Sequence, residues 1–267
     1  MNIVLLDAEE LSADGVVTLH GRRAEHILRV LRSTVGSTLR AGIIDGARGA
    51  MVVQAMTADS VTVQFALGQG DSSATAFRDL TVVLAVPRPK ALSRVVESLA
   101  TFGVRRVVLC NSWRVDKAYL ASPRMAVSAL REDCVLGAEQ GGHTHLPEVV
   151  VYPRFMQMLD AEFADASVAL GQRLVAHPGA AVDALGFATG SVRPQVVAIG
   201  PEGGWIDREL TTFAARGFAP LWLSSSILRV ETAVAVVLGQ LELAARSADV
   251  GRASGASTRV GQELHHG

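Results

Sequence analysis

The sequence predicts an α/β protein of two domains, a small β-barrel followed by a larger domain built on a mostly parallel sheet. Three observations lead to this fold class. The 267 residues, of which 49% are hydrophobic and 19% charged, are enough for two buried cores. Short Val, Leu and Thr runs separated by Gly-containing turns fill residues 1–72. Longer apolar runs alternating with helical patterns fill residues 77–246.

The amino-terminal part has the pattern of a small barrel or sandwich, with the runs VVTL, STLRAG, IIDGARG, MVVQAM and SVTVQFAL. Its one helical segment, near 22–32, places Ala24, Ile27, Leu28 and Leu31 on one face. The opposite face is basic and consists of Arg22, His26, Arg29 and Arg32. Such a face is either merely solvated or a surface that holds RNA phosphates. The polar stretch at 68–76 is predicted to be the interdomain linker.

The second part alternates strands with helices. The strand runs are TVVLAV, VRRVVLC, PEVVVY, RLVAH, QVVAIG and PLWLS, and the helices are expected near 91–102, 123–140, 153–163, 206–216 and 231–246. Continuous apolar strands are typical of a parallel sheet that is covered on both faces. Residues 247–267 are polar, rich in Gly and Ser and without periodicity, which predicts a disordered tail.

Composition limits the classes of function. Cys110 and Cys134 have no metal-ligand spacing, so we expect both to be buried as small hydrophobic residues. His143 and His145 lack a nearby third ligand, so no metal is predicted and a satisfied or RNA-facing pair is favoured. The net charge of −1 means that any RNA surface is a local patch. No apolar stretch is long enough for a membrane span and the start lacks a signal peptide, which predicts a cytoplasmic protein.

Two segments carry the chemistry. GPEGGW, at 200–205, follows a strand, where a Gly-rich turn either lets a ligand approach the backbone or is merely a tight turn. It is neither a dinucleotide fingerprint nor a P-loop. SILRVETA, at 226–233, lies where the last strand meets the last helix, and Arg229 and Glu231 are its only charged residues. Taken alone, these two are equally well interpreted as a surface ion pair beside a helix dipole.

Together these segments resemble the SPOUT methyltransferases, and within them the RsmE family of 16S rRNA uridine N3-methyltransferases. That family has G-P-E-G-G followed by I-L-R-x-E-T-A, and here both strings occur in that order. HILRVLRSTVG, at 26–36, is similar to the family's H-x-x-x-V-L-R-x-x-x-G, so the resemblance covers nearly the whole ordered chain. Several positions depart from the family pattern, and among them Thr101-Phe102 stands for the E-L of E-L-G-V. Leu223–Ser226 replaces L-G-x-R, Trp113 replaces the Glu of S-E-R, and His143 replaces an Arg.

The resemblance implies a PUA-like barrel at 1–72, a trefoil-knot domain at 77–246, S-adenosylmethionine as cofactor and a homodimer that completes the active site. It implies catalytic roles for Arg229, which would stabilise negative charge on the uracil, and for Glu231, a candidate proton acceptor. Lys90, Arg88 and Arg114 join the basic helix face as candidate RNA contacts. The implied cofactor residues are His177, Ile199, Gly200, Pro201, Glu202, Gly203, Gly204, Leu223, Ile227, Leu228, Val230, Thr232 and Ala233.

Three other functions remain open from sequence. The first is a SPOUT methyltransferase that acts on another RNA position, because the cofactor loops do not specify the acceptor. The second is a non-catalytic RNA-binding module in ribosome assembly, in which the loops are structural. The third is a generic nucleotide-binding α/β enzyme, which the missing phosphate-binding motifs disfavour.

Overall fold

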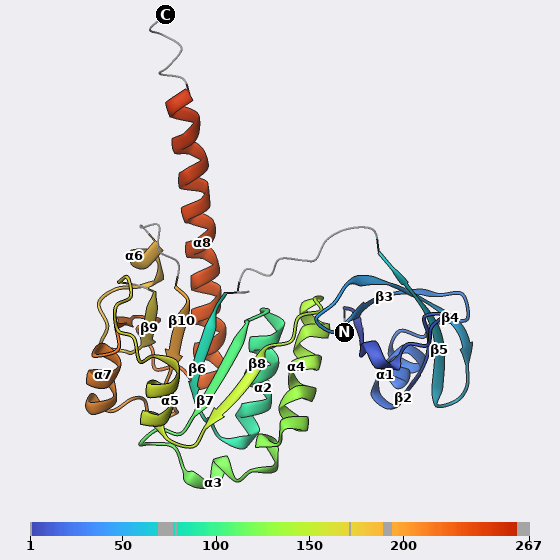
Figure 1. The fold of residues 1–267 in the computed structure, drawn as a ribbon, viewed down its shortest axis with the longest axis horizontal. Coiled ribbons are helices and arrows are strands. Elements are labelled where there is room, and N and C mark those ends of the chain that lie inside the picture. Colours follow the sequence, from blue (N-terminus) through green and yellow to red (C-terminus); the bar gives the residue numbers. More distant parts are fainter. Residues whose placement is uncertain (1, 69–76, 78, 171, 189–193, 261–267) are drawn as a thin grey trace, which may run out of the picture.

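A computed structural model describes residues 2–68, 77, 79–170, 172–188 and 194–260, which form two sheets with their helices (Figure 1). Of the linker predicted at 68–76, only Gly68 is among the described residues. The β-rich part and the α/β part follow each other along the chain as the hydrophobic patterns predict. The chain therefore has the mixed α/β fold expected from sequence.

The first sheet has the strand order β1-β3-β4-β5-β2. Its strands are β1 (Val4–Leu6), β2 (Val16–His20), β3 (Thr38–Ile43), β4 (Arg48–Met56) and β5 (Ser60–Leu67). β1 pairs with β3 in parallel and the other pairs are antiparallel, with a bulge in β4 between Val53 and Ala55. Alternate side chains of the strands, such as Leu19, Met51 and Val63, are fully buried and form the core of this part.

A short helix closes this core. It begins as α1 (Gly21–Glu25) and continues as a π-helical turn, η2 (His26–Val30); a separate 3-10 turn, η1 (Ala8–Glu10), precedes it in the chain. Ala24 and Ile27 are fully buried, as predicted, but Leu31 is 45% exposed. The prediction for Leu31 was wrong because its amide donates to the His26 carbonyl, five residues back, and this wider turn rotates the following side chains away from the core.

The second sheet is fully parallel, in the order β11-β9-β10-β6-β7-β8. Its strands are β6 (Thr81–Ala85), β7 (Arg106–Cys110), β8 (Glu148–Tyr152), β9 (Arg173–Ala176), β10 (Val196–Ile199) and β11 (Phe218–Leu221). The helices are α2 (Pro89–Thr101), α3 (Lys117–Leu120), α4 (Val127–Gly141), α5 (Phe155–Glu162), α6 (Ala184–Ala188), α7 (Asp207–Ala214) and α8 (Val230–Val260), with a 3-10 turn, η3 (Pro123–Met125). Each helix expected from sequence is therefore present.

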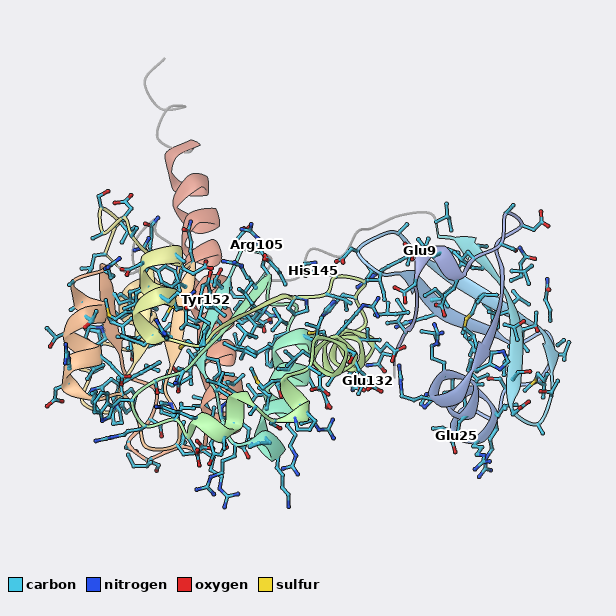
Figure 2. The ribbon with its side chains drawn as sticks, turned by 60° about the horizontal axis from the view of Figure 1, so that its bottom comes forward. Glu9, Glu25, Arg105, Glu132, His145 and Tyr152 are labelled. Atoms are coloured by element: carbon cyan, nitrogen blue, oxygen red, sulfur yellow. The ribbon has the colours of Figure 1, made fainter. Side chains whose placement is uncertain are left out.

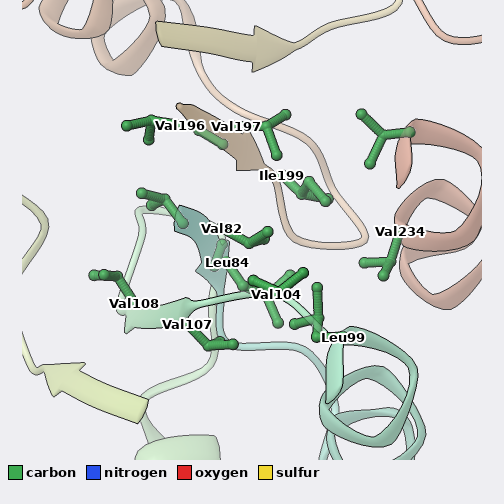
Figure 3. Close-up of a cluster of buried hydrophobic side chains, with 14 of the residues drawn as sticks. Val82, Leu84, Leu99, Val104, Val107, Val108, Val196, Val197, Ile199 and Val234 are labelled. Atoms are coloured by element: carbon green, nitrogen blue, oxygen red, sulfur yellow. The ribbon is translucent and has the colours of Figure 1, made fainter. Parts of the chain in front are cut away.

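The main core lies between this sheet and its helices. Figure 3 shows Leu99 of α2 and Val234 of α8 directed toward Leu84 of β6 and Ile199 of β10, and all four side chains are buried. Central strands are buried on both faces, which explains why their sequences are uninterrupted apolar runs. Cys110 and Cys134 are buried free thiols, as predicted, and burial raises the pKa of both.

The last helix, α8, is longer than predicted and extends beyond the rest of the fold (Figure 1). Residues 247–260, expected to belong to a disordered tail, are helical, and residues 261–267 lie outside the described residues. Alanine and arginine favour helix, and no proline interrupts this stretch. Even with this length, no helix of the described chain has a segment apolar enough to cross a membrane.

The two sheets are joined through α4 and the segment after it. The carboxylate of Glu139, which is 1% exposed, accepts hydrogen bonds from Arg22 (2.7 Å) and from the amide of Leu5 (3.2 Å). Arg131 pairs with Asp7. His145, which lies between the two parts in Figure 2, approaches Asp45 at 3.1 Å, and His143 is buried nearby in the chain. These contacts fix the first sheet relative to the second.

Candidate active site

A cavity of about 200 Å³ lies beyond the carboxyl ends of three neighbouring strands, β9, β10 and β11. Three segments line it, one after each strand, namely residues 176–178, 199–205 and 223–233 in part. Loops that follow parallel strands meet at the same edge of the sheet, which is where open α/β folds bind ligands. The GPEGGW and SILRVETA segments thus face one common space.

The Gly-rich loop is held in a shape that needs glycine. The amide of Gly204 donates to the carbonyl of Pro201 at 2.8 Å, and Gly204 has a φ of 72°, in the left-handed region that side chains disfavour. At Gly203, a Cβ atom would lie 3.0 Å from the Arg114 side chain, whose guanidinium donates to the Gly203 carbonyl. The loop therefore presents its backbone closely to the cavity.

The loop after β11 is tied to helix α8. Gln240 donates its side-chain amide to the Leu223 carbonyl at 2.9 Å, and the amide of Ser226 donates to the Ser224 hydroxyl at 3.0 Å. The serines that replace the family's Gly and Arg thus make a local side-chain turn in place of a glycine turn. On the other side, the His177 amide donates to the Leu221 carbonyl at 3.0 Å, which joins the first and third segments.

The charge of the cavity restricts what it can hold. Among the described residues that line it, Glu202 is the one carboxylate, and no Lys or Arg side chain takes part. The rest of the lining consists of apolar residues and glycines together with the neutral polar residues Ser224 and Ser226 and with His177. Phosphate groups need cations or a ring of free amides, so this lining does not suit a nucleotide phosphate.

The fold and the cavity agree with comparisons to known proteins. A family model described as "RNA methyltransferase domain" matches residues 75–242. This chain belongs to the RNA methyltransferase family. It is 29% identical over 236 residues to Ribosomal RNA small subunit methyltransferase E of Treponema pallidum, covering 87% of each chain. It is 23% identical to Ribosomal RNA small subunit methyltransferase E 1 of Borreliella burgdorferi, covering 87% of this chain and 94% of that one.

A solved structure gives the same comparison in three dimensions. The Neisseria gonorrhoeae Ribosomal RNA small subunit methyltransferase E, bound to S-adenosyl methionine, superposes with a TM-score of 0.68 at 20% identity. The match covers 91% of this chain and 97% of that chain. Both parts of this RNA methyltransferase therefore share the fold of that protein.

In this RNA methyltransferase the sequence-predicted cofactor residues converge, except one. All of them line the cavity apart from Thr232, which is exposed. Arg229 and Glu231 do not line it either. Glu231 lies between Val230 and Ala233, the two residues of the first turn of α8 that face the cavity, and Arg229, which directly precedes α8, is exposed. The sequence analysis missed Gln240, whose side chain holds the loop by a hydrogen bond to the Leu223 carbonyl. No local pattern indicates a contact between residues 17 positions apart.

The candidate RNA residues lie in two places. Arg29 pairs with Glu25 at 3.2 Å and Arg32 is exposed, whereas Arg22 is directed inward to Glu139. His26 is partly buried, and burial lowers its pKa. The basic face predicted on this helix is therefore smaller than the sequence suggests. Two other candidates contact residues that line the cavity, Arg88 at Glu202 and Arg114 at Gly203. Lys90 is exposed at the start of α2.

Proposed function

We propose that this chain methylates the N3 position of a uridine in small-subunit (16S) ribosomal RNA, with S-adenosylmethionine as the methyl donor. The observation that carries the proposal is that the GPEGG and ILRVETA loops both line one and the same cavity. The names of the related proteins support the ribosomal RNA substrate, and a ribosomal substrate implies a cytoplasmic location. The N3 position comes from the resemblance of the two loops to the RsmE family.

The lining fits the proposed donor. Ile199, Leu223 and Leu228 offer apolar walls for an adenine ring, while backbone groups of the Gly-rich loop are available to its polar atoms. Glu202 is the one carboxylate among the described lining residues, and Arg88 approaches it at 3.8 Å from outside the lining. No Lys or Arg side chain lines the cavity, so its described wall has no cation that would repel a sulfonium or ammonium group. When bound, S-adenosylmethionine would supply an electrophilic methyl group at this place.

Two charged residues at the start of α8 are the proposed catalytic groups. Arg229 is exposed, and its chain neighbours Leu228 and Val230 line the cavity, so a base bound at the mouth would meet its guanidinium. A cation there would stabilise the negative charge of a uracil that has lost its N3 proton. Glu231 is half-buried in the same turn and is the proposed proton acceptor.

The resemblance also suggests features of the architecture that remain proposals. The first sheet with α1 would be a PUA-like barrel over residues 1–72, and the second sheet would carry a trefoil knot within residues 77–246. The knot rests on the resemblance of the GPEGG and ILRVETA loops to the RsmE family. The exposed position of Arg229 supports a homodimer in which a second copy completes the active site.

The proposal is tested in two stages. Isothermal calorimetry with S-adenosylmethionine should show binding to the purified chain, and an absence of binding would favour the non-catalytic assembly module. Mass spectrometry of nucleosides from 16S rRNA should then show 3-methyluridine only in cells that contain the protein. Appearance of a different methylated nucleoside would retain the enzyme class and reject the N3 position.

The role of Arg229 is tested separately. Arg229→Ala should abolish methyl transfer and leave the affinity for S-adenosylmethionine nearly unchanged, because its side chain does not line the cavity. Normal turnover by this variant would remove Arg229 from the mechanism. Arg105→Ala is the matched control and should behave as the unchanged protein. Arg105 is an exposed arginine directly before β7, at the sheet edge opposite to the carboxyl ends of the strands where the cavity lies.

A further inference from the structure

A second pocket, of about 650 Å³, shares no lining residue with the cofactor cavity. It lies beyond the carboxyl ends of β7 and β8 and beside the amino-terminal end of α7. Both pockets therefore open at the same edge of the parallel sheet. The residues of this second pocket that bear on its chemistry are Ser112, Trp113, Lys117, Arg154, Arg208 and Glu209.

Two buried polar atoms of this pocket lack a hydrogen-bond partner among the described residues. Ser112 is only 6% exposed, and its hydroxyl oxygen is unpaired, as is the side-chain oxygen of the neighbouring Asn111. Glu209, also buried, is fully engaged, because its two oxygens accept the amides of Trp113 (2.8 Å) and Ile206 (2.9 Å). An unpaired buried polar atom costs free energy, so a ligand that supplies a partner would be stabilised here.

The rim of the pocket carries an aromatic platform and positive charge. Trp113 lines the pocket and is 79% exposed, which is unusual for so large an aromatic side chain. Lys117, Arg154 and Arg208 are exposed, and within the described part of the chain none of them forms an ion pair. A flat ring, free cations and inward hydrogen-bonding groups are the combination that recognises an unstacked nucleotide.

The second pocket and the cofactor cavity share a wall. Arg114, next to Trp113, donates to the Gly203 carbonyl of the Gly-rich loop. Trp205 lines the cofactor cavity, and its ring contacts that of Phe155, which lines the second pocket, with centroids 6.0 Å apart. A strand of RNA that presents one base to the cofactor cavity would bring its next nucleotides to the second pocket.

We propose that this pocket binds an unpaired nucleotide of the RNA that flanks the acceptor base, with the base stacked on Trp113 and a phosphate near Lys117, Arg154 and Arg208. This inference rests on the proposed function and adds a specificity subsite to it. Trp113 stands where the resembling family has Glu, so the stacking platform would be a property of this chain.

The test measures binding of a fluorescently labelled single-stranded hexauridylate by anisotropy, with calorimetry of S-adenosylmethionine on the same samples. Trp113→Ala should weaken oligonucleotide binding by roughly 5- to 150-fold, the range measured for loss of one base–aromatic stack. Trp113→Phe should retain most of the affinity. Arg154→Ala should lower the salt dependence of log Kd by about 0.7 for one lost phosphate contact. Arg105→Ala should change neither quantity.

Equal affinity of Trp113→Ala and the unchanged protein would overturn the subsite, and so would failure of the unchanged protein to bind the oligonucleotide. Light scattering covers the rival occupant: a Trp113→Ala variant with altered oligomeric mass and unaltered RNA affinity would assign the pocket to a second copy of the chain. Calorimetry keeps the two hypotheses apart. If the unchanged protein does not bind S-adenosylmethionine, the proposed function is refuted. If it binds S-adenosylmethionine but Trp113→Ala does not weaken oligonucleotide binding, only the subsite is refuted.

Discussion

The buried carboxylate of Glu139 allows a quantitative test of how the two sheets are held together. In Glu139→Ala, the amide of Leu5, itself 1% exposed, loses its acceptor, which costs about 1–3 kcal/mol for an unpaired buried group. Arg22 is 39% exposed and regains water, so the lost ion pair adds only about 0.5–1 kcal/mol. The free energy of unfolding should therefore fall by about 1.5–4 kcal/mol.

Urea unfolding followed by circular dichroism measures this loss, and two variants serve as controls. Glu139→Gln keeps an oxygen for the Leu5 amide and should lose no more than about 1 kcal/mol. Arg131→Ala removes the ion pair with Asp7, which joins the same two parts of the chain but is exposed on both sides, and should cost about 0–1 kcal/mol. The comparison separates burial from the mere presence of an ion pair.

The reasoning would be refuted if Glu139→Ala and Arg131→Ala destabilised the protein equally. A functional consequence follows from the same contacts, because they hold the first sheet, with the candidate RNA residues Arg29 and Arg32, in place relative to the second. Glu139→Ala should raise the KM for RNA and leave the affinity for S-adenosylmethionine unchanged, since the carboxylate is remote from the cavity lining. An equal loss of both affinities would indicate general unfolding instead.

Three further predictions concern the loops and the pH dependence of stability. Gly204→Val should weaken S-adenosylmethionine binding in calorimetry by about 5- to 30-fold, because a branched side chain at a φ of 72° strains the loop by about 1–2 kcal/mol. Gly239→Ala, in open space on α8, is the control and should be neutral or stabilising. Gln240→Leu should weaken S-adenosylmethionine binding by about 5- to 10-fold, equivalent to the ~1 kcal/mol of one hydrogen bond to the cofactor loop, and unchanged binding would show that the loop holds itself. Burial lowers the pKa of His143, so in mildly acidic solution the imidazole is protonated in the unfolded chain and neutral in the folded chain. The free energy of unfolding should therefore be full above about pH 6.5, the ordinary pKa of histidine, and fall below it. Urea unfolding at several pH values should show that this fall is smaller in His143→Gln.

Much of the fold followed from local patterns. Apolar runs such as QVVAIG predicted buried parallel strands, and the helical periods near 91–102 and 206–216 matched α2 and α7 to within a few residues. Two expectations failed: residues 247–260 continue α8 where a disordered tail was expected, and one local hydrogen bond changed the helical period near Leu31. Leu31 was assigned to the core because an ordinary α-helix was assumed, and the π turn at His26 displaced it.

The sequence by itself determined the two parts of the chain, the identity of the loop residues and the resemblance that names their chemistry. Only the tertiary structure decided which side chains line the same cavity. The strand order of the sheet brings the loops after β9, β10 and β11 together, although Ala176 and Ala233 are 57 positions apart in the chain. It also placed Val230 in the cavity and Arg229 outside it. The spacing of residues along a helix or strand determines which side chains lie on the same face. What that face packs against depends on contacts with residues far away in the chain, which no local pattern encodes.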